Sequence, residues 1–254
     1  MASIFQNYDD TKHAFMNPQD TTKPVPDFPK HCVTTFSKNI IQKFAALEDV
    51  KIIANLYTAN GAIPIYEINY CNSRIAFFLS LVGAPACIAC LEEIIASGAE
   101  KIVMFGCAGV LDDSAVQGKL MIPSSAVRDE GTSYHYLPPS EEINADSRFV
   151  EVLEKCFAQK GIPYVTGKTW TTDAIYRETP KRIAERKRQG CLTVEMECSA
   201  ALAVTQFRQI PFAQFLYGAD SLSGDSWAPN DLTEYGLKGA DKYMTLAFEC
   251  VLGL

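Results

Sequence analysis

Three short segments place small or acidic residues directly after an apolar run. Gly106 to Gly109 follow KIVMF, Glu195 to Glu197 follow LTV, and Gly218 to Asp220 follow PFAQFLY. In an open α/β sheet, ligands bind at the carboxyl ends of the strands, so these are the places where side chains can do chemistry. Small residues let backbone amides approach a ligand, and carboxylates accept hydrogen bonds from hydroxyls or transfer protons.

Each segment also has an ordinary structural explanation. A Gly-x-x-Gly sequence after a strand is most often a tight turn, and Glu197 can cap a helix, because acids favour the positive N-terminal end. Asp220 can likewise be a cap or a turn residue. Each segment alone is therefore weak evidence, and the functional interpretation depends on finding all three in one chain.

The elements that would position these residues follow from the hydrophobic pattern. Runs rich in β-branched and aromatic residues predict strands over 50–57, 62–70 and 74–82. Pro85 then begins an apolar helix that stops at Gly98, and the nearly all-apolar KIVMF predicts a strand buried on both faces. Strand, helix and buried strand in this order indicate a parallel crossover. We also predict helices over 147–160, 180–189, 197–208 and 232–254, and strands over 164–169, 192–196 and 211–219.

Composition limits the kind of protein this can be. The 254 residues suffice for one large α/β domain with a mixed sheet. A net charge of −7 gives no electrostatic reason to expect nucleic acid or an anionic membrane as partner. No apolar stretch approaches the roughly 20 residues that span a bilayer, and no signal peptide is recognisable, so we expect a cytoplasmic protein.

Two further features concern the ends and the cysteines. Residues 1–30 contain four prolines among polar residues, which predicts an N-terminal arm lying over a surface, with a partner subunit as one candidate for it. The nine cysteines are odd in number and many lie in apolar segments, which favours a reducing compartment. Cys87 and Cys90 form a C-x-x-C without a second pair, so we predict no metal site.

Together and in this order, the segments resemble the nucleoside phosphorylase family, which includes uridine phosphorylase, hexameric purine nucleoside phosphorylase and the methylthioadenosine nucleosidases. The resemblance covers about residues 40 to 250, and its most specific part is Met-x-Glu at a strand-to-helix junction. It implies a single-domain, three-layer α/β/α sandwich with a central mixed β-sheet, with residues 31–254 as the catalytic domain. The matching segments are Gly83-Ala84-Pro85, LEEIIASGAEKI, FGCAGVL, AVRDEGTSYHY, TTDAIY, VEMECSAL and GAD.

The resemblance implies roles for three residues in breaking a glycosidic bond. Glu197 matches the glutamate that accepts hydrogen bonds from the ribose 2′ and 3′ hydroxyls, and Met196 matches the methionine beneath the sugar. Asp220 resembles the acid that protonates the leaving base in purine-acting members. The implied reaction is phosphorolysis through an oxocarbenium-like transition state, with phosphate as co-substrate and no metal or redox cofactor. The family forms dimers or hexamers, so a homodimer or homohexamer is expected.

Five more positions match the family less closely. Ile175 and Tyr176 align with the aromatic pair beside the base, although an aliphatic residue stands at the first position. Gly106 and Cys107 lie in the segment that contacts phosphate, where the family has Ser or Thr in place of cysteine. Arg177 directly follows Tyr176, and we predict that it contacts phosphate. The alternative is a solvated arginine at the start of a basic helix.

The sequence also departs from the family where phosphate binds. Residues 35–40, TFSKNI, replace a Gly-Asp-Pro-x-Arg loop, and Met104 replaces an arginine in the strand before the small residues. Arginine forks are the natural host for phosphate, so these losses leave three hypotheses open. They are a phosphorylase, a hydrolase of the same fold and a nucleoside-binding protein without chemistry. The basic residues that can substitute are Lys38, Arg74, Arg128, Lys168 and Arg177.

The preferred base is equally open. Asp220 favours purines, because it can protonate a ring nitrogen or hold the amino or oxo edge of the base. The DEGTSYHY segment and the overall length instead resemble uridine phosphorylase. The sequence therefore predicts a nucleoside substrate without deciding between the two classes of base.

Overall fold

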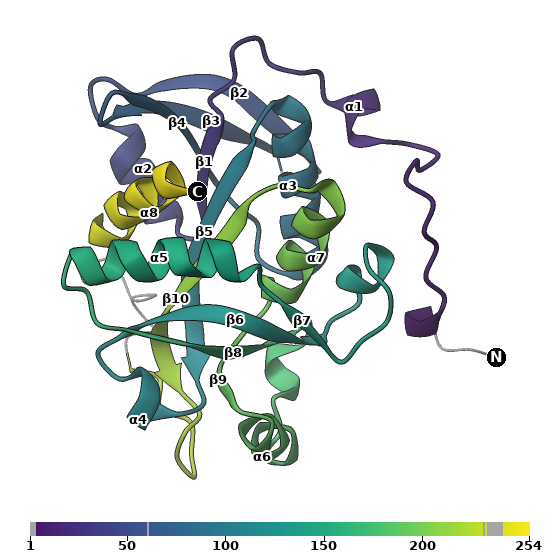
Figure 1. Ribbon diagram of the computed structural model, residues 1–254, viewed down its shortest axis with the longest axis vertical. Coiled ribbons are helices and arrows are strands. Elements are labelled where there is room, and N and C mark those ends of the chain that lie inside the picture. Colours follow the sequence, from purple (N-terminus) through teal and green to yellow (C-terminus); the bar gives the residue numbers. More distant parts are fainter. Residues whose placement is uncertain (1–3, 60, 231, 233–240) are drawn as a thin grey trace.

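The computed structural model describes residues 4–59, 61–230, 232 and 241–254 (Figure 1). The strands are β1 (His31–Thr35), β2 (Lys51–Thr58), β3 (Gly61–Tyr70), β4 (Ser73–Leu79), β5 (Lys101–Val110), β6 (Leu120–Asp129), β7 (Glu142–Asn144), β8 (Tyr164–Thr172), β9 (Cys191–Glu195) and β10 (Phe212–Ser221). The α-helices are α1 (Pro18–Thr21), α2 (Lys38–Ala45), α3 (Ala84–Ser97), α4 (Asp113–Val116), α5 (Ser147–Gln159), α6 (Pro180–Arg188), α7 (Cys198–Arg208) and α8 (Asp241–Gly253). The 3₁₀ helices with described bounds are η1 (Ile4–Gln6), η2 (Thr132–His135) and η3 (Ile175–Arg177).

The strands form one mixed sheet that partly closes on itself. Its order is β10-β6-β8-β9-β5-β1-β4-β3-β2, with β7 beside β6. Because β10 also pairs with β5, the strands β5, β10, β6, β8 and β9 form a closed ring. The ring encloses a small apolar cluster that includes Ala108, Met121 and Leu216. Its closure brings the ends of β5, β9 and β10 together, as the sequence interpretation requires.

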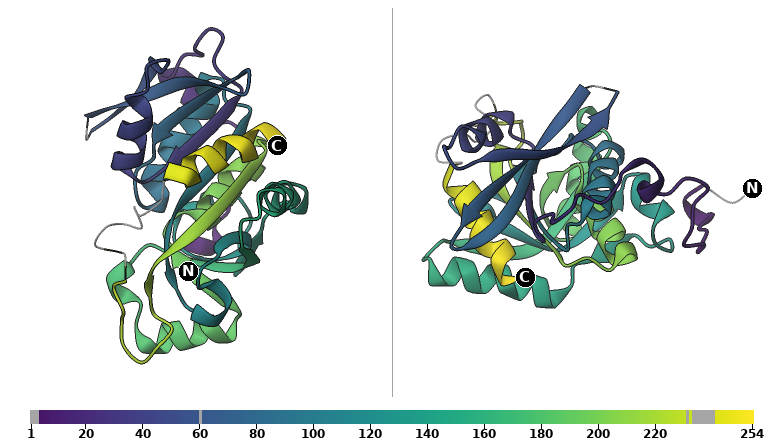
Figure 2. Two further views of the ribbon diagram at one scale, coloured as in Figure 1. Left: turned by 90° about the vertical axis from the view of Figure 1, so that its left-hand side faces the viewer. Right: turned by 90° about the horizontal axis from the view of Figure 1, so that it is seen from above.

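Helices cover both faces of the sheet. On one face α3 and α7 pack against the first core cluster, and on the other α2, α5 and α8 pack against the second. Figure 1 shows α5 and α8 crossing one face, and Figures 1 and 2 place α6 at the end of the molecule opposite β2, β3 and β4. The three-layer α/β/α sandwich with a mixed central sheet is therefore confirmed.

The predicted crossover is confirmed, but the predicted turn after KIVMF is wrong. Strands β4 and β5 both run parallel to β1, which lies between them, and α3 connects them. Strand β5 continues through Gly106 to Val110 instead of turning. At Gly109 a Cβ atom would lie 2.6 Å from a methyl carbon of Leu222 and 3.0 Å from one of Val194. Glycine is needed there for close packing inside a strand.

Most predicted helices are confirmed to within one residue at each end. The sequence interpretation did not identify α1, β1, α2, α4, β6 and β7. In β6 the strand pattern is interrupted by Pro123 and two serines, and β1 is short, so neither gives a clear periodic signal. Of the helix predicted over 232–254, the structure describes α8, while residues 233–240 lie outside the described residues.

The N-terminal segment lies on the chain's own helices. Figure 1 shows residues 4–30 running along the side of α3 and α7. The ring of Phe5 lies 5.0 Å from that of Tyr134, the Lys12 ammonium lies 4.2 Å above the Phe207 ring, and the Val25 amide donates to the Ser97 carbonyl. Residues 1–3 of the predicted arm lie outside the described residues.

An aromatic cluster stabilises the core beneath α5. Phe215 is fully buried, stacks on Phe105 at 5.2 Å and meets the edge of Phe157 at 5.4 Å. We expect Phe215→Ala to lower the free energy of unfolding by about 3–5 kcal/mol, because the surrounding side chains cannot fill the cavity. Phe15→Ala, at a fully exposed ring of the arm, is the control and is expected to change little. Denaturant unfolding measures both, and equal effects would contradict this account of the core.

Candidate active site

Glu197 lies where two strand-to-helix junctions meet. Strand β9 ends at Glu195 and α7 begins at Cys198, so Glu197 stands at the N-terminal end of the helix. Its side chain is buried, with 5 % of its surface exposed, and its Oε1 accepts the amide N–H of Gly83 at 2.5 Å. Gly83 precedes α3 with φ of 93°, a conformation that favours glycine.

The surroundings of Glu197 disfavour its charge. Burial raises its pKa most, and the negative charge of Glu195 raises it further. The Gly83 amide acts in the opposite direction, because it donates a hydrogen bond to the carboxylate. The ionisation of Glu197 therefore depends on its neighbours, and acids with shifted pKa values are common in functional sites.

Glu195 supports this junction from beneath, a role the sequence interpretation did not assign. Its Oε2 accepts the backbone N–H groups of Glu197 at 2.7 Å and Cys198 at 2.6 Å. Its Oε1 accepts the hydroxyl of Thr171 on β8 at 2.6 Å. Glu195 thus caps α7 and fixes the backbone that carries Glu197.

Asp220 lies near the end of β10 and is half-buried. Its Oδ2 accepts the indole N–H of Trp227 at 2.7 Å. Two backbone hydrogen bonds between Ser221 and Ala228 close the loop that returns Trp227 to Asp220. The acid is thus held by a tryptophan whose own ring is largely exposed.

Cys107 is a residue of β5 on which both acids act. Burial raises the pKa of its thiol to about 11, and the charges of both Glu197 and Asp220 contribute. Asp220 of β10 pairs with Gly109 of β5, which pairs in turn with Val194 of β9, so the three strands meet at this part of the sheet. The structure therefore brings together the three segments that the sequence singled out.

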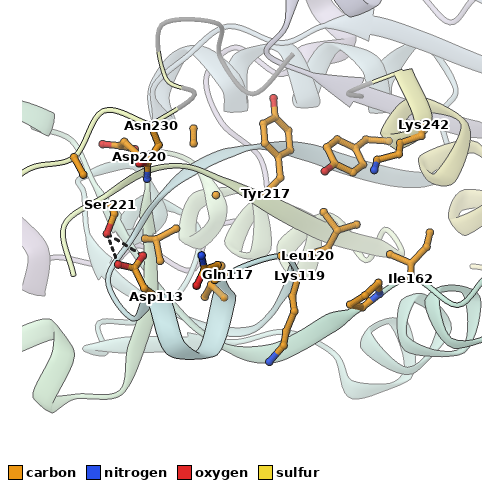
Figure 3. Close-up of a pocket in the computed structure, with 18 of the residues that line it drawn as sticks. Asp113, Gln117, Lys119, Leu120, Ile162, Tyr217, Asp220, Ser221, Asn230 and Lys242 are labelled. Carbon is orange, nitrogen blue, oxygen red and sulfur yellow. Dashed lines mark hydrogen bonds between the residues drawn. The ribbon is translucent and has the colours of Figure 1, made fainter. Parts of the chain in front are cut away.

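A cavity of about 1100 Å³ borders this region on the side of α4 and α8 (Figure 3). Asp220 contributes to its wall, whereas Glu197 and Met196 do not. Figure 3 shows Ser221 bonded to Asp113, with both hydroxyl-to-carboxylate distances 2.9 Å. The cavity thus extends from Asp220 away from Glu197, while Met196 is half-buried at the end of β9.

Glu178 is a further acid in this region that the sequence interpretation missed. It is half-buried, and burial together with the charge of Asp220 raises its pKa to about 7. Glu178 stands two residues after Tyr176, and this position next to the expected base-binding pair could have marked it as a site residue. The side chains of Ile175 and Tyr176 on η3 are 49 % and 96 % exposed.

Three of the five basic candidates for phosphate are engaged elsewhere. Arg74 pairs with Glu67 at 2.6 Å, Arg128 bonds Ser133 at 2.9 Å, and Lys168 pairs with Glu142. Lys38 and Arg177 are exposed and form no ion pair within the described residues. They are the two basic candidates left for an anion.

The position at which the resemblance places a phosphate-binding arginine is apolar in this chain. Met104 is fully buried, with its sulfur 3.9 Å from that of Cys87. The ring of Phe36 covers Gly106, where a Cβ atom would lie 2.8 Å from a ring carbon. Cys107, which follows Gly106, is half-buried.

The described residues contain no group of three or more His, Cys, Asp or Glu side chains arranged to hold a metal ion. None of the helices described combines the length and the apolar character needed to cross a membrane.

Comparisons with known proteins agree with the fold. Purine nucleoside phosphorylase of Plasmodium falciparum is 23 % identical over 170 residues, 65 % of this chain and 69 % of that protein. The crystal structure of uridine phosphorylase from Vibrio fischeri matches with a TM-score of 0.74 at 20 % identity, covering 93 % of this chain and 98 % of that one. AMP nucleosidase from Bacteroides thetaiotaomicron matches with a TM-score of 0.72 at 19 % identity, covering 90 % of each chain. The family model described as "Phosphorylase superfamily" matches residues 30–251, so this chain belongs to the phosphorylase superfamily.

Proposed function

We propose that this protein cleaves the N-glycosidic bond of a nucleoside, with phosphate as the group that accepts the ribose. The observation that carries the proposal is the pairing of β5 with both β9 and β10, which brings the strand ends next to Glu197 and Asp220 together. A sugar held by one acid and a base facing the other would place the glycosidic bond above this end of β5. The family membership supports the same reaction class.

In this reaction Glu197 accepts hydrogen bonds from the ribose hydroxyls, and Met196 packs beneath the sugar. The hydrogen bonds strengthen as the sugar becomes cationic, so they stabilise the transition state more than the substrate. Asp220 supplies a proton to the leaving base, which departs as a neutral molecule. Ile175 and Tyr176 border the base, and their exposure leaves that side of the site open to solvent.

Phosphate requires cations, and Lys38 and Arg177 are proposed to supply them. Lys38 begins α2, two residues after the Phe36 ring that contacts Gly106, so it lies near the phosphate segment. In this proposal the amides of Gly106 and Cys107 face the anion. Cytoplasmic location and a homodimer or homohexamer stay predictions of the sequence.

Hydrolysis is a second candidate, and one observation favours it. The apolar side chains of Met104 and Phe36 stand where the family has cationic groups. A phosphate dianion is poorly hosted there, whereas water is neutral. The similarity in fold to an AMP nucleosidase agrees with this alternative.

The nucleophile can be decided by omitting phosphate. Purine and pyrimidine nucleosides are incubated with the protein with and without phosphate, and free base, ribose and ribose 1-phosphate are measured. We expect base release only with phosphate, with ribose 1-phosphate as product. Base release that is unaffected by phosphate removal and yields free ribose would establish hydrolysis. Tight nucleoside binding without base release in either condition would indicate a binding protein and reject the enzymatic proposal.

The same assay tests the phosphate site. Lys38→Met is expected to raise the KM for phosphate by roughly tenfold, since it removes one charged contact. Lys43→Met is the matched control, because Lys43 lies on the same helix and pairs with Asp241. Equal effects of the two substitutions would exclude a specific role for Lys38.

A further inference from the structure

The two glutamates at the end of β9 have very different hydrogen-bond environments. Glu195 accepts three hydrogen bonds at 2.6–2.7 Å, one from Thr171 and two from the backbone amides of Glu197 and Cys198. Glu197 accepts the Gly83 amide N–H, and the backbone of Met196 adds a weaker stabilisation of its charged form. Donors stabilise the charged form of a carboxylate, so Glu195 is the better place for a negative charge. Two charged carboxylates so close together in a buried site would repel each other strongly.

Glu195 is also fixed by a network of buried side chains. The Thr171 oxygen that donates to Glu195 accepts the amide N–H of Ser199 at 2.9 Å. The Ser199 hydroxyl in turn donates to Glu130 at 2.9 Å. These side chains are all buried, so the carboxylate of Glu195 has little freedom to move.

The charged and titratable groups around the pair are acids and thiols. Glu130, which follows β6, raises the pKa of Glu195. The negative charge of Glu197 raises the pKa of the thiols of Cys87 on α3 and Cys107 on β5. The thiol of Cys198 on α7 feels both carboxylates. Neither carboxylate forms an ion pair within the described part of the chain. No cation there compensates a second negative charge.

We propose that Glu195 is a positioning residue that carries the negative charge of the pair, anchors the backbone of Glu197 and leaves Glu197 as the proton-bearing member in the free site. The role in catalysis rests on the proposed function. Glu197 stabilises a cationic sugar best when it is ionised. The charge on Glu195 therefore delays formation of the active form until the pH rises.

The test is Glu195→Gln, which removes the charge and keeps the shape. Without the negative neighbour Glu197 ionises at lower pH, so the acid limb of the kcat/KM profile is expected to shift down by about one pH unit. Glu154→Gln is the matched control, because Glu154 on α5 accepts the hydroxyl of Thr166, also on β8, at 2.5 Å. It is expected to leave the profile unchanged. A folded E195Q protein with an unshifted acid limb would overturn the proposal.

Two further measurements keep the proposal testable. Thr171→Val removes one donor to Glu195 and is expected to shift the profile in the same direction by less, should E195Q not fold. Carboxyl-carbon NMR of glutamate-labelled protein, with signals assigned from E195Q and E197Q, needs no substrate. Glu195 is expected to lose its proton at lower pH than Glu197, and the reverse order would refute the charge assignment. A protein that shows the expected order but turns over no nucleoside would reject the proposed function alone.

Discussion

Replacing Glu197 by glutamine is expected to lower kcat/KM for a ribonucleoside roughly 100- to 1,000-fold. A hydrogen bond to a charged group contributes about 1.5–3 kcal/mol, and Glu197 is proposed to accept two from the ribose. Because those bonds strengthen as the sugar becomes cationic, kcat should fall more than KM rises. Steady-state kinetics with a ribonucleoside and its 2′-deoxy analogue measure the effect. The loss should be smaller for the 2′-deoxy analogue, which offers one hydroxyl fewer.

The stability of the same variant provides the control. Burial raises the pKa of Glu197 above its value in the unfolded chain. Between these two pKa values the folded wild type therefore holds a proton that the unfolded chain has lost. Its contribution to stability is present below the unfolded pKa and is lost as the pH rises through the folded pKa. Glu197→Gln has no such group and should be at least as stable as wild type at pH 9. An inactive variant that also unfolds more easily there would contradict a functional role for this buried acid.

Strands and helices with strong periodic patterns were predictable because the spacing of their apolar residues identifies them locally. The apolar run at Lys101 forms a doubly covered strand, and Pro85 and Gly98 mark the two ends of its crossover helix. The ring of strands was not predictable in this way. It depends on β10 pairing with both β5 and β6, which are distant in sequence, and no local pattern encodes that pairing.

The candidate site also contains residues that a local pattern identifies and residues that it does not. Glu197 and Asp220 were found because each follows an apolar strand, and the family resemblance gave them roles. Glu178 was missed because its burial and the effect of Asp220 on its pKa arise only in the folded protein, between residues distant in sequence. The role of Glu195 was missed because a glutamate at a strand end gives no sign that its own oxygens will cap the following helix.

Replacing Asp220 by asparagine tests the proton donor directly. The amide cannot deliver a proton, so kcat with an ordinary nucleoside is expected to fall roughly 10²–10⁴-fold, the usual contribution of general acid catalysis. The asparagine oxygen can still accept the indole N–H of Trp227, so the loop that carries Trp227 is retained. Asp113→Asn is the matched control, because Asp113 lines the same cavity and bonds the neighbouring Ser221. That variant is expected to remain close to wild type.

The leaving group distinguishes acid catalysis from a structural role. A p-nitrophenyl riboside releases an anion that is stable without protonation, so it needs no help from Asp220. We therefore expect D220N to lose much less activity on this substrate than on a nucleoside, when both are followed by steady-state kinetics. Equal losses on the two substrates would show that Asp220 supports the site without donating the proton. An undiminished rate on nucleosides would instead direct attention to Glu178, the acid beside it whose pKa burial raises to about 7.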